Sequence, residues 1–343
     1  MSKHKISWTD ETWNPVIGCS KVSEGCQNCY AERMAWRLAC MGQSDYRKVI
    51  KRTGHYNHQK NQSEDMKPYW TGKILHRESE LEKPLHWKKP RKIFVCSMSD
   101  LFAAPFEFID KVFAVMALTP QHTYQLLTKR ADGMLEYFEA EPHGQIDVQI
   151  IKGLEYFVGK RKKYAGQGRL DYLRKRGDRD WLWPLPNVHL GVTCENQEWA
   201  DERIPKLLQI PAAKRFVSLE PLLGPIDLEN IDLKRKWPFK AETEKLNALL
   251  GYGRSSRSSN PEGAMFCDRE YNKLDQVIIG CESLPGGRAG RFQDGFIEVA
   301  IDIVRQCRAA GVKCHVKQIP IGGRVCHDIG FFPKELESNY VKS

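Results

Sequence analysis

Short apolar runs alternate with amphipathic segments along most of the chain. The runs that suit buried strands occupy residues 13–18, 92–96, 124–127, 188–193, 215–219, 276–280 and 312–316. Between them, apolar residues recur at helical spacing near residues 30–40, 107–118, 131–139, 197–209 and 296–310, and Gly311 suits the end of the last helix. Strands that alternate with helices in this way predict an α/β fold with parallel strands and crossover connections.

The number of strand–helix units bears on how the sheet closes. Six or seven units favour a partial (β/α)6-type, TIM-like barrel, and an open doubly wound sheet is the alternative. We expect one domain over residues 1–320 and a C-terminal tail over residues 321–343. Insertions near 43–90, 142–186 and 234–271 interrupt the pattern, and the stretch GYGRSSRSSNPEG in the last of them predicts a mobile surface loop.

The charge of the chain changes this picture by indicating a partner. The 343 residues carry a formal net charge of +10, which favours an anionic partner, with nucleic acid as the first candidate. The basic segment 152–176 interleaves Tyr156, Phe157, Tyr164 and Tyr172 with Lys and Arg. That mixture is typical of surfaces that hold phosphates and stack bases, although a solvated helix face would show it too.

The chain shows no sign of a membrane or secretory destination. No apolar run approaches the roughly 20 residues that a membrane span needs. The N-terminal residues MSKHKISWTDETWNP have no apolar core of a secretory signal. We therefore expect a cytoplasmic protein without a membrane partner.

Three of the 11 cysteines form a compact motif. Cys19, Cys26 and Cys29 follow the first apolar run, and Gly25 allows a tight turn before the Cys-x2-Cys pair. Most other cysteines, such as Cys96, lie in apolar runs and suit core packing. The motif predicts one three-thiolate site, for which an iron–sulfur cluster, a structural zinc ion and no metal remain open.

The motif resembles the radical S-adenosylmethionine (radical SAM) superfamily, in which three clustered cysteines follow the first strand of a β/α repeat. The usual spacing there is Cys-x3-Cys-x2-Cys, whereas this chain has Cys-x6-Cys-x2-Cys. The segments WNPVIGC, CQNCYAERMA, KIFVCSMSDLF, YQLLTKR, VHLGVTCENQ, RFVSLEPLLGP and VIIGCES resemble a phage-encoded branch of the superfamily that is also found in bacterial genomes. A phage-encoded protein would work in the host cytoplasm.

The resemblance implies a reaction and two cofactors. Cys19, Cys26 and Cys29 would hold three irons of a [4Fe–4S] cluster, whose fourth iron would bind S-adenosylmethionine. Reductive cleavage of S-adenosylmethionine would start hydrogen abstraction from a substrate, with electrons from an unidentified donor. The basic charge favours a nucleic acid base or nucleotide as substrate, for example a modified pyrimidine in phage DNA. The alternatives are a zinc-stabilised nucleic-acid-binding protein without catalysis, and a radical SAM enzyme acting on a small metabolite or a peptide.

Polar residues follow the next two predicted strands. Ser97, Ser99 and Asp100 end the strand at 92–96, where the resemblance implies groups that bind the amino nitrogen of S-adenosylmethionine. Asp100 would otherwise cap the following turn. Lys129 and Arg130 end the next strand, and a cation there suits the carboxylate of S-adenosylmethionine or a substrate phosphate.

Carboxylates follow three later strands. Glu195, Glu220 and Glu282 suit hydrogen bonds to ribose hydroxyls, to the adenine amino group or to a cationic substrate, or each is a charge at a helix N-terminus. Lys317 and Gln318 lie near the end of the last strand. The loop 284–291 (LPGGRAGR) predicts either close backbone approach to an anion or a flexible surface loop.

Overall fold

A computed structural model describes residues 9–53, 56–57, 62–63, 67–139, 183–233, 244–256 and 266–336. The chain divides into two compact units, residues 1–188 and 189–343. We treat each unit by itself. This division does not test the predicted domain over residues 1–320, which stays a prediction.

Unit 1 contains three parallel strands that are neighbours in the main sheet, in the order β1, β8, β9. Its strands are β1 (Glu11–Trp13), β2 (Val16–Ile17), β3 (Ile50–Arg52), β4 (Tyr56–Asn57), β5 (Gln62–Ser63), β6 (Pro68–Trp70), β7 (Leu75–His76), β8 (Lys92–Val95) and β9 (Thr123–Thr128). Its helices are α1 (Tyr30–Cys40), α2 (Ser44–Val49), α3 (Glu78–Leu81), α4 (Phe106–Leu118) and α5 (Ala131–Glu139), with 3-10 turns η1 (Glu24–Cys26), η2 (Lys83–His86) and η3 (Leu101–Ala103).

Unit 2 contains strands β10, β11, β16 and β17, which are parallel, and β18, which is antiparallel to β17. The strands are β10 (Val188–Thr193), β11 (Lys214–Leu219), β12 (Ile231–Asp232), β13 (Glu244–Asn247), β14 (Tyr252–Ser256), β15 (Phe266–Glu270), β16 (Gln276–Gly280), β17 (Lys313–Ile321) and β18 (Arg324–Cys326). The helices are α8 (Gln197–Gln209) and α9 (Phe296–Ala309), with 3-10 turns η5 (Pro285–Gly287), η6 (Ile329–Phe331) and η7 (Lys334–Leu336).

These elements confirm the α/β class. Eight main-sheet strands are mainly parallel and alternate with helices, and the predicted runs from 92–96 onward coincide with strands of this sheet. The first run, 13–18, was placed wrongly: the main-sheet strand β1 ends at Trp13, and the rest of the run contains β2, which pairs with β7 in a separate antiparallel sheet. The interior of β8, β10, β11 and β16 is buried on both faces, as parallel strands require. Closure of the strands into a partial barrel stays a prediction.

The core of unit 1 joins the cysteine motif to the first predicted insertion. One buried cluster contains Ile17, Ala31, Ala35, Ala39, Tyr46, Val49, Ile50, Trp70 and Met98. Cys19 and Cys29 pack against it. Residues of α1 therefore share a core with α2, β3 and β6, so this part of the polar segment 43–90 is packed structure with its own buried side.

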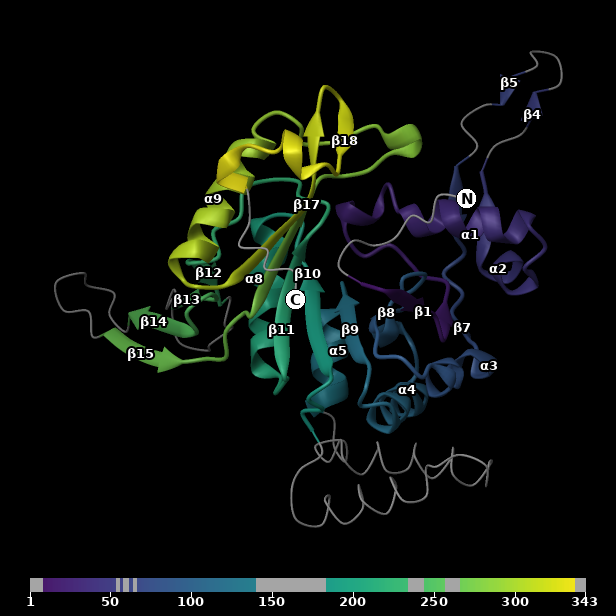
Figure 1. The fold of residues 1–343 in the computed structure, drawn as a ribbon, viewed down its shortest axis with the longest axis horizontal. Helices are drawn as coiled ribbons and strands as arrows, with labels where there is room; N and C mark the ends of the chain where they lie inside the picture. The colour runs from purple at the N-terminus through teal and green to yellow at the C-terminus, as the bar shows by residue number, and fades with distance from the viewer. Residues whose placement is uncertain are drawn as a thin grey trace, which may run out of the picture. The chain divides into compact units, whose positions relative to one another are not determined.

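Two expectations for unit 2 need correction. The stretch predicted as a mobile loop contains β14, which pairs with β13 and β15 in an antiparallel sheet with β12 (Figure 1). The alternation there was too short and too polar to be recognised as a strand. In addition, the last strand, expected at 312–316, is longer than predicted, since β17 continues to Ile321 and β18 folds back beside it (Figure 1).

No helix in the described ranges is long and apolar enough to cross a membrane.

Candidate functional site

The loop that carries the three cysteines starts at Gly18, a position where any residue other than glycine would be strained. Gly18 has φ +87°, a left-handed conformation that residues with a Cβ rarely adopt. A Cβ on Gly18 would overlap the carbonyl oxygen of Lys73 and lie 3.0 Å from Val49 Cγ1. The start of the cysteine loop therefore lies directly against the chain that follows β6.

The same glycine ties the cysteine loop to the loop after β8. The Gly18 N–H donates to the Met98 carbonyl at 3.2 Å, and the Ser99 hydroxyl donates to the Gly18 carbonyl. Ser97 Oγ donates to Asn14 Oδ1 at 3.1 Å, and its carbonyl accepts from the Tyr30 hydroxyl at 2.8 Å. The hydroxyls of both predicted site serines are thus engaged within the protein.

Asp100 joins the loop after β8 to the end of β9. Thr128 Oγ1 lies 2.8 Å from both carboxylate oxygens of Asp100, and the Lys129 N–H donates at 3.0 Å. The Phe102 N–H donates at 3.1 Å, which makes Asp100 the N-cap of η3. Burial raises the pKa of Asp100, and the hydrogen bond from Thr128 opposes that shift. These contacts favour the capping role that the sequence left open for Asp100.

Arg130 completes the connection between the three strand ends. Its Nη2 donates to Ser20 Oγ at 2.6 Å and lies 3.4 Å from the Ser20 carbonyl. Its Nε is buried and has no hydrogen-bond partner in the part of the chain that the structure describes. The loops after β1, β8 and β9 therefore meet at the carboxyl ends of parallel strands, where α/β proteins place their ligands.

The three thiols lie near one another in this loop cluster. Burial raises the pKa of Cys19 to about 12; Asp100 adds to the shift, Arg130 opposes it, and Cys29 and Cys26 raise it further. Burial also raises the pKa of Cys29, the N-cap of α1, although the N–H groups of Glu32 and Ala31 lower it. Cys26 Sγ lies 3.8 Å from Ser23 Oγ. The effects of Cys26 and Cys29 on Cys19, and of Cys26 on Cys29, indicate that the motif gathers its thiols in one region.

The donor chemistry of this region fits a thiolate-bound metal centre. Cys19, Cys26 and Cys29 are each partly exposed and none is in a disulfide. In the described residues, no three His, Cys, Asp or Glu side chains are placed so that they hold a metal ion as they stand. Binding one would therefore require the thiols to turn toward a common centre.

The cysteine loop is also fixed to α1 and to β6. Lys21 Nζ lies 3.4 Å from Glu32 Oε2, and Glu32 Oε1 accepts from the Trp70 N–H at 3.1 Å. The Glu32 side chain is 4% exposed, so burial strengthens its electrostatic interactions. These interactions through Glu32 hold the cysteine loop in place, in addition to the hydrogen bonds of Gly18 and Arg130.

In unit 2, Glu195 is a structural carboxylate. It is fully buried and pairs with Arg203 Nη1 at 2.8 Å, and the same nitrogen donates to the Thr193 carbonyl at 2.6 Å. The Arg203 guanidinium stacks over Trp199, 3.9 Å from the ring centroid. The pair fastens α8 to the end of β10.

Glu220 is the most accessible of the three glutamates. Its side chain is 23% exposed and its Oε1 lies 2.6 Å from Lys317 Nζ and 3.3 Å from Gln318 Nε2. Gly280 lies beneath it, since a Cβ there would be 3.1 Å from Glu220 Cδ. The segment after β11, the end of β16 and the middle of β17 therefore meet at this carboxylate, and Lys317 and Gln318 contact it from within β17.

Glu282 is held by the glycine-rich loop that follows it. Arg291 Nη2 donates to Oε1 at 2.6 Å, and Arg291 Nε and N–H donate to Oε2 at 3.0 and 2.9 Å. A Cβ on Gly290 would overlap Glu282 Oε2. Of the two alternatives that the sequence left open for the loop 284–291, the contacts favour a close backbone approach to an anion, and that anion is the protein's own carboxylate.

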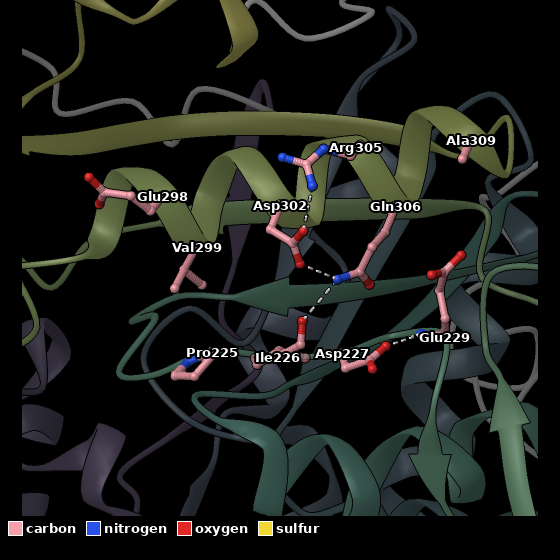
Figure 2. A pocket seen from close by; sticks show the side chains of 10 residues that line it. All are labelled: Pro225, Ile226, Asp227, Glu229, Glu298, Val299, Asp302, Arg305, Gln306 and Ala309. Atoms are coloured by element: carbon pink, nitrogen blue, oxygen red, sulfur yellow. Dashed lines mark hydrogen bonds and ion pairs between the residues drawn. The ribbon is translucent and has the colours of Figure 1, made fainter.

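A pocket of about 560 Å³ lies elsewhere in unit 2, between α9 and the segment after β11 (Figure 2). Its lining contains none of the predicted site residues. Asp302 accepts from Arg305 and Gln306, and Asp227 accepts from the Glu229 N–H, so these polar groups are engaged with one another.

The sequence did not indicate three residues that position the cysteine loop, and one predicted segment lies outside the described residues. Ser20, Asn14 and Lys73 help to position the cysteine loop, yet only neighbourhood to the motif or to a strand end marks them in the sequence. The basic segment 152–176 lies outside the described residues.

The fold and the thiol cluster define an α/β protein with a candidate metal centre, and the chain belongs to the DUF5131 family. The family's model matches residues 3–327, and its description is "Protein of unknown function". No curated protein and no solved structure matches the chain.

Proposed function

We propose that the protein is a radical SAM enzyme whose [4Fe–4S] cluster is held by Cys19, Cys26 and Cys29. The observation that carries the proposal is the position of these thiols. Cys26 and Cys29 lie close enough to Cys19 to raise its pKa, in a loop tied to the ends of β8 and β9. This is the edge of a parallel sheet at which cofactor chemistry is usually built.

The chain's own residues prepare the thiols for such a cluster. The N–H groups at the start of α1 stabilise negative charge on Cys29, and Arg130 does so for Cys19. The buried cluster under Cys19 and Cys29 keeps water from one side of the site. The chemistry supplied by a bound cluster is one-electron cleavage of S-adenosylmethionine, which starts hydrogen abstraction from the substrate.

The finer features follow from the same proposal. The eight main-sheet strands form a partial barrel of the type that the superfamily resemblance implies. Among the three glutamates, Glu220 binds S-adenosylmethionine or substrate, together with Lys317 and Gln318. Glu195 and Glu282 are less suited to this role because the carboxylates of these two residues are buried against arginines. The substrate is a nucleic acid base or nucleotide, and the net charge of +10 supports that choice.

Anaerobic reconstitution tests the proposal. The full chain should bind about four irons with matching sulfide, and reduction with S-adenosylmethionine should release 5′-deoxyadenosine. Cys26→Ala should lose the cluster, whereas Cys40→Ala, which removes an exposed thiol at the end of α1, should keep it. Zinc alone with no 5′-deoxyadenosine would reject the proposal, and equal cluster content in the two variants would reject the ligand assignment.

A further inference from the structure

Unit 1 carries a strongly basic surface that the sequence did not single out. We call it the basic face and define it as the exposed cations of α2, β3, β6 and the adjoining residues: Arg47, Lys48, Lys51, Arg52, Lys67 and Lys73. The same segments, 44–53 and 67–73, contain a single acidic residue, Asp45. Six cations therefore stand against one carboxylate in these segments, and Asp45 pairs with Lys48 at 3.0 Å and with Arg77 at 3.5 Å.

The pairing of β3 with β6 gives this face an aromatic centre. Lys51 is opposite Tyr69, and Ile50 is opposite Trp70. Residues directly opposite in an antiparallel pair point to the same side of the sheet. Ile50 and Trp70 are buried in the core, which turns Lys51 and Tyr69 outward, and Tyr69 is 37% exposed.

A second aromatic group lies on the side of α1. The Arg52 guanidinium stands over the Trp36 ring, 5.5 Å from its centroid. Trp36 is partly buried against the core cluster that also contacts Cys19 and Cys29. Flat aromatic and guanidinium groups among lysines offer stacking for bases as well as charge for phosphates.

The basic face borders the candidate metal centre. Lys73 follows β6, and its carbonyl is the atom that a Cβ on Gly18 would overlap. Gly18 is the residue immediately before Cys19. A chain bound along β6 would therefore run toward the cysteine loop within the same unit.

We propose that the basic face binds a single strand of nucleic acid, with Lys51, Lys67 and Lys73 on phosphates and Tyr69 stacked on a base. A single strand suits the site because an exposed ring stacks on a base only when that base is free of its duplex neighbours. This inference rests on the proposed function only in treating the bound strand as the substrate of the thiol site. Binding itself requires neither iron nor S-adenosylmethionine.

Salt-dependent binding by the full chain provides the test. Fluorescence anisotropy would follow labelled single-stranded DNA and RNA of about 12 nucleotides, at salt between about 50 and 200 mM. Each phosphate contact contributes about 0.7 to the slope of log K against log salt for a single strand. The triple variant Lys51→Gln, Lys67→Gln, Lys73→Gln should therefore reduce the magnitude of that negative slope by about 2.

The matched control removes three exposed lysines of unit 2: Lys214→Gln, Lys313→Gln, Lys334→Gln. It changes net charge equally and should leave the slope nearly unchanged. If both triple variants lower the slope alike, binding follows overall charge and the proposal is overturned. The DNA and RNA arms decide which nucleic acid is preferred.

Tyr69 separates stacking from charge. Tyr69→Ala should weaken binding of the single strand about tenfold at fixed salt, and Tyr69→Phe should retain it. Equal binding by Tyr69→Ala, tighter binding of a duplex, or equal affinity for anionic lipid vesicles would each overturn the proposal. Because the assay uses protein without cluster as well as reconstituted protein, its outcome is independent of whether 5′-deoxyadenosine is formed.

Discussion

Replacement of Gly18 by alanine tests the packing that brings the cysteine loop against β6. The added methyl meets two separate penalties, because Gly18 has φ +87° and because the methyl would overlap the Lys73 carbonyl. A left-handed conformation costs alanine about 1–2 kcal/mol, and overpacking costs about 1–3 kcal/mol more. We therefore expect Gly18→Ala to lower the free energy of unfolding by about 2–5 kcal/mol.

Gly42→Ala is the matched control. Gly42 has φ +92°, and a Cβ there would meet no atom within 4 Å. Gly42→Ala should therefore lower the free energy of unfolding only by the conformational cost of about 1–2 kcal/mol. Both variants replace glycine with alanine, so the effect of alanine on the unfolded chain is the same in each.

Urea denaturation would give both free energies, and iron content after reconstitution would report on the cysteine loop. Gly18→Ala should lose more stability than Gly42→Ala and also bind less iron, since the carbonyl and N–H of Gly18 fix the loop to Ser99 and Met98. Equal stability of the two variants would refute the close approach to Lys73, and with it the position of the basic face beside the thiols.

Three further outcomes concern unit 2. Arg203→Met should cost about 3–5 kcal/mol because it removes the arginine that pairs with the buried Glu195 carboxylate, and adding Glu195→Gln should recover part of the loss; additive losses in the denaturation assay would contradict the pairing. Gly290→Ala should displace Glu282 from the backbone and appear as faster hydrogen exchange in loop 284–291, whereas an unchanged exchange pattern would count against the contact. Burial lowers the pKa of His315, as Lys317 does to a smaller extent while Glu220 opposes it. Below about pH 6.5 the unfolded chain then binds more protons, so stability should fall as pH decreases through that value, and His315→Gln should flatten the fall in chemical denaturation.

Much of the fold was predictable because buried parallel strands and amphipathic helices leave strong periodic signals. The helix expected at 131–139 matches α5, and the strand expected at 188–193 matches β10. The antiparallel strands β13 to β15 were missed because their short polar segments lack a clean alternation. Their pairing depends on partners distant in sequence, which local patterns do not reveal.

The candidate site was only partly predictable for a related reason. The cysteine spacing marks Cys19, Cys26 and Cys29 as candidate ligands without any structure, because thiols on one short loop can reach a common centre. The partners of the strand-end residues are different, since Arg203 and Arg291 reach Glu195 and Glu282 from later in the chain. A sequence shows which carboxylates follow strands but not which cations neutralise them.

The pairing of these carboxylates with cations of the protein determines which ligand groups unit 2 can bind at its strand ends. Each of Glu195, Glu220 and Glu282 already carries an internal counter-ion, so a cationic ligand has to exchange with an arginine or lysine of the protein rather than with water. A neutral hydroxyl or amino group meets no such competitor for its hydrogen bond. The strand ends of unit 2 should therefore discriminate against cations and favour uncharged polar groups, with Glu220 as the carboxylate that such a group reaches.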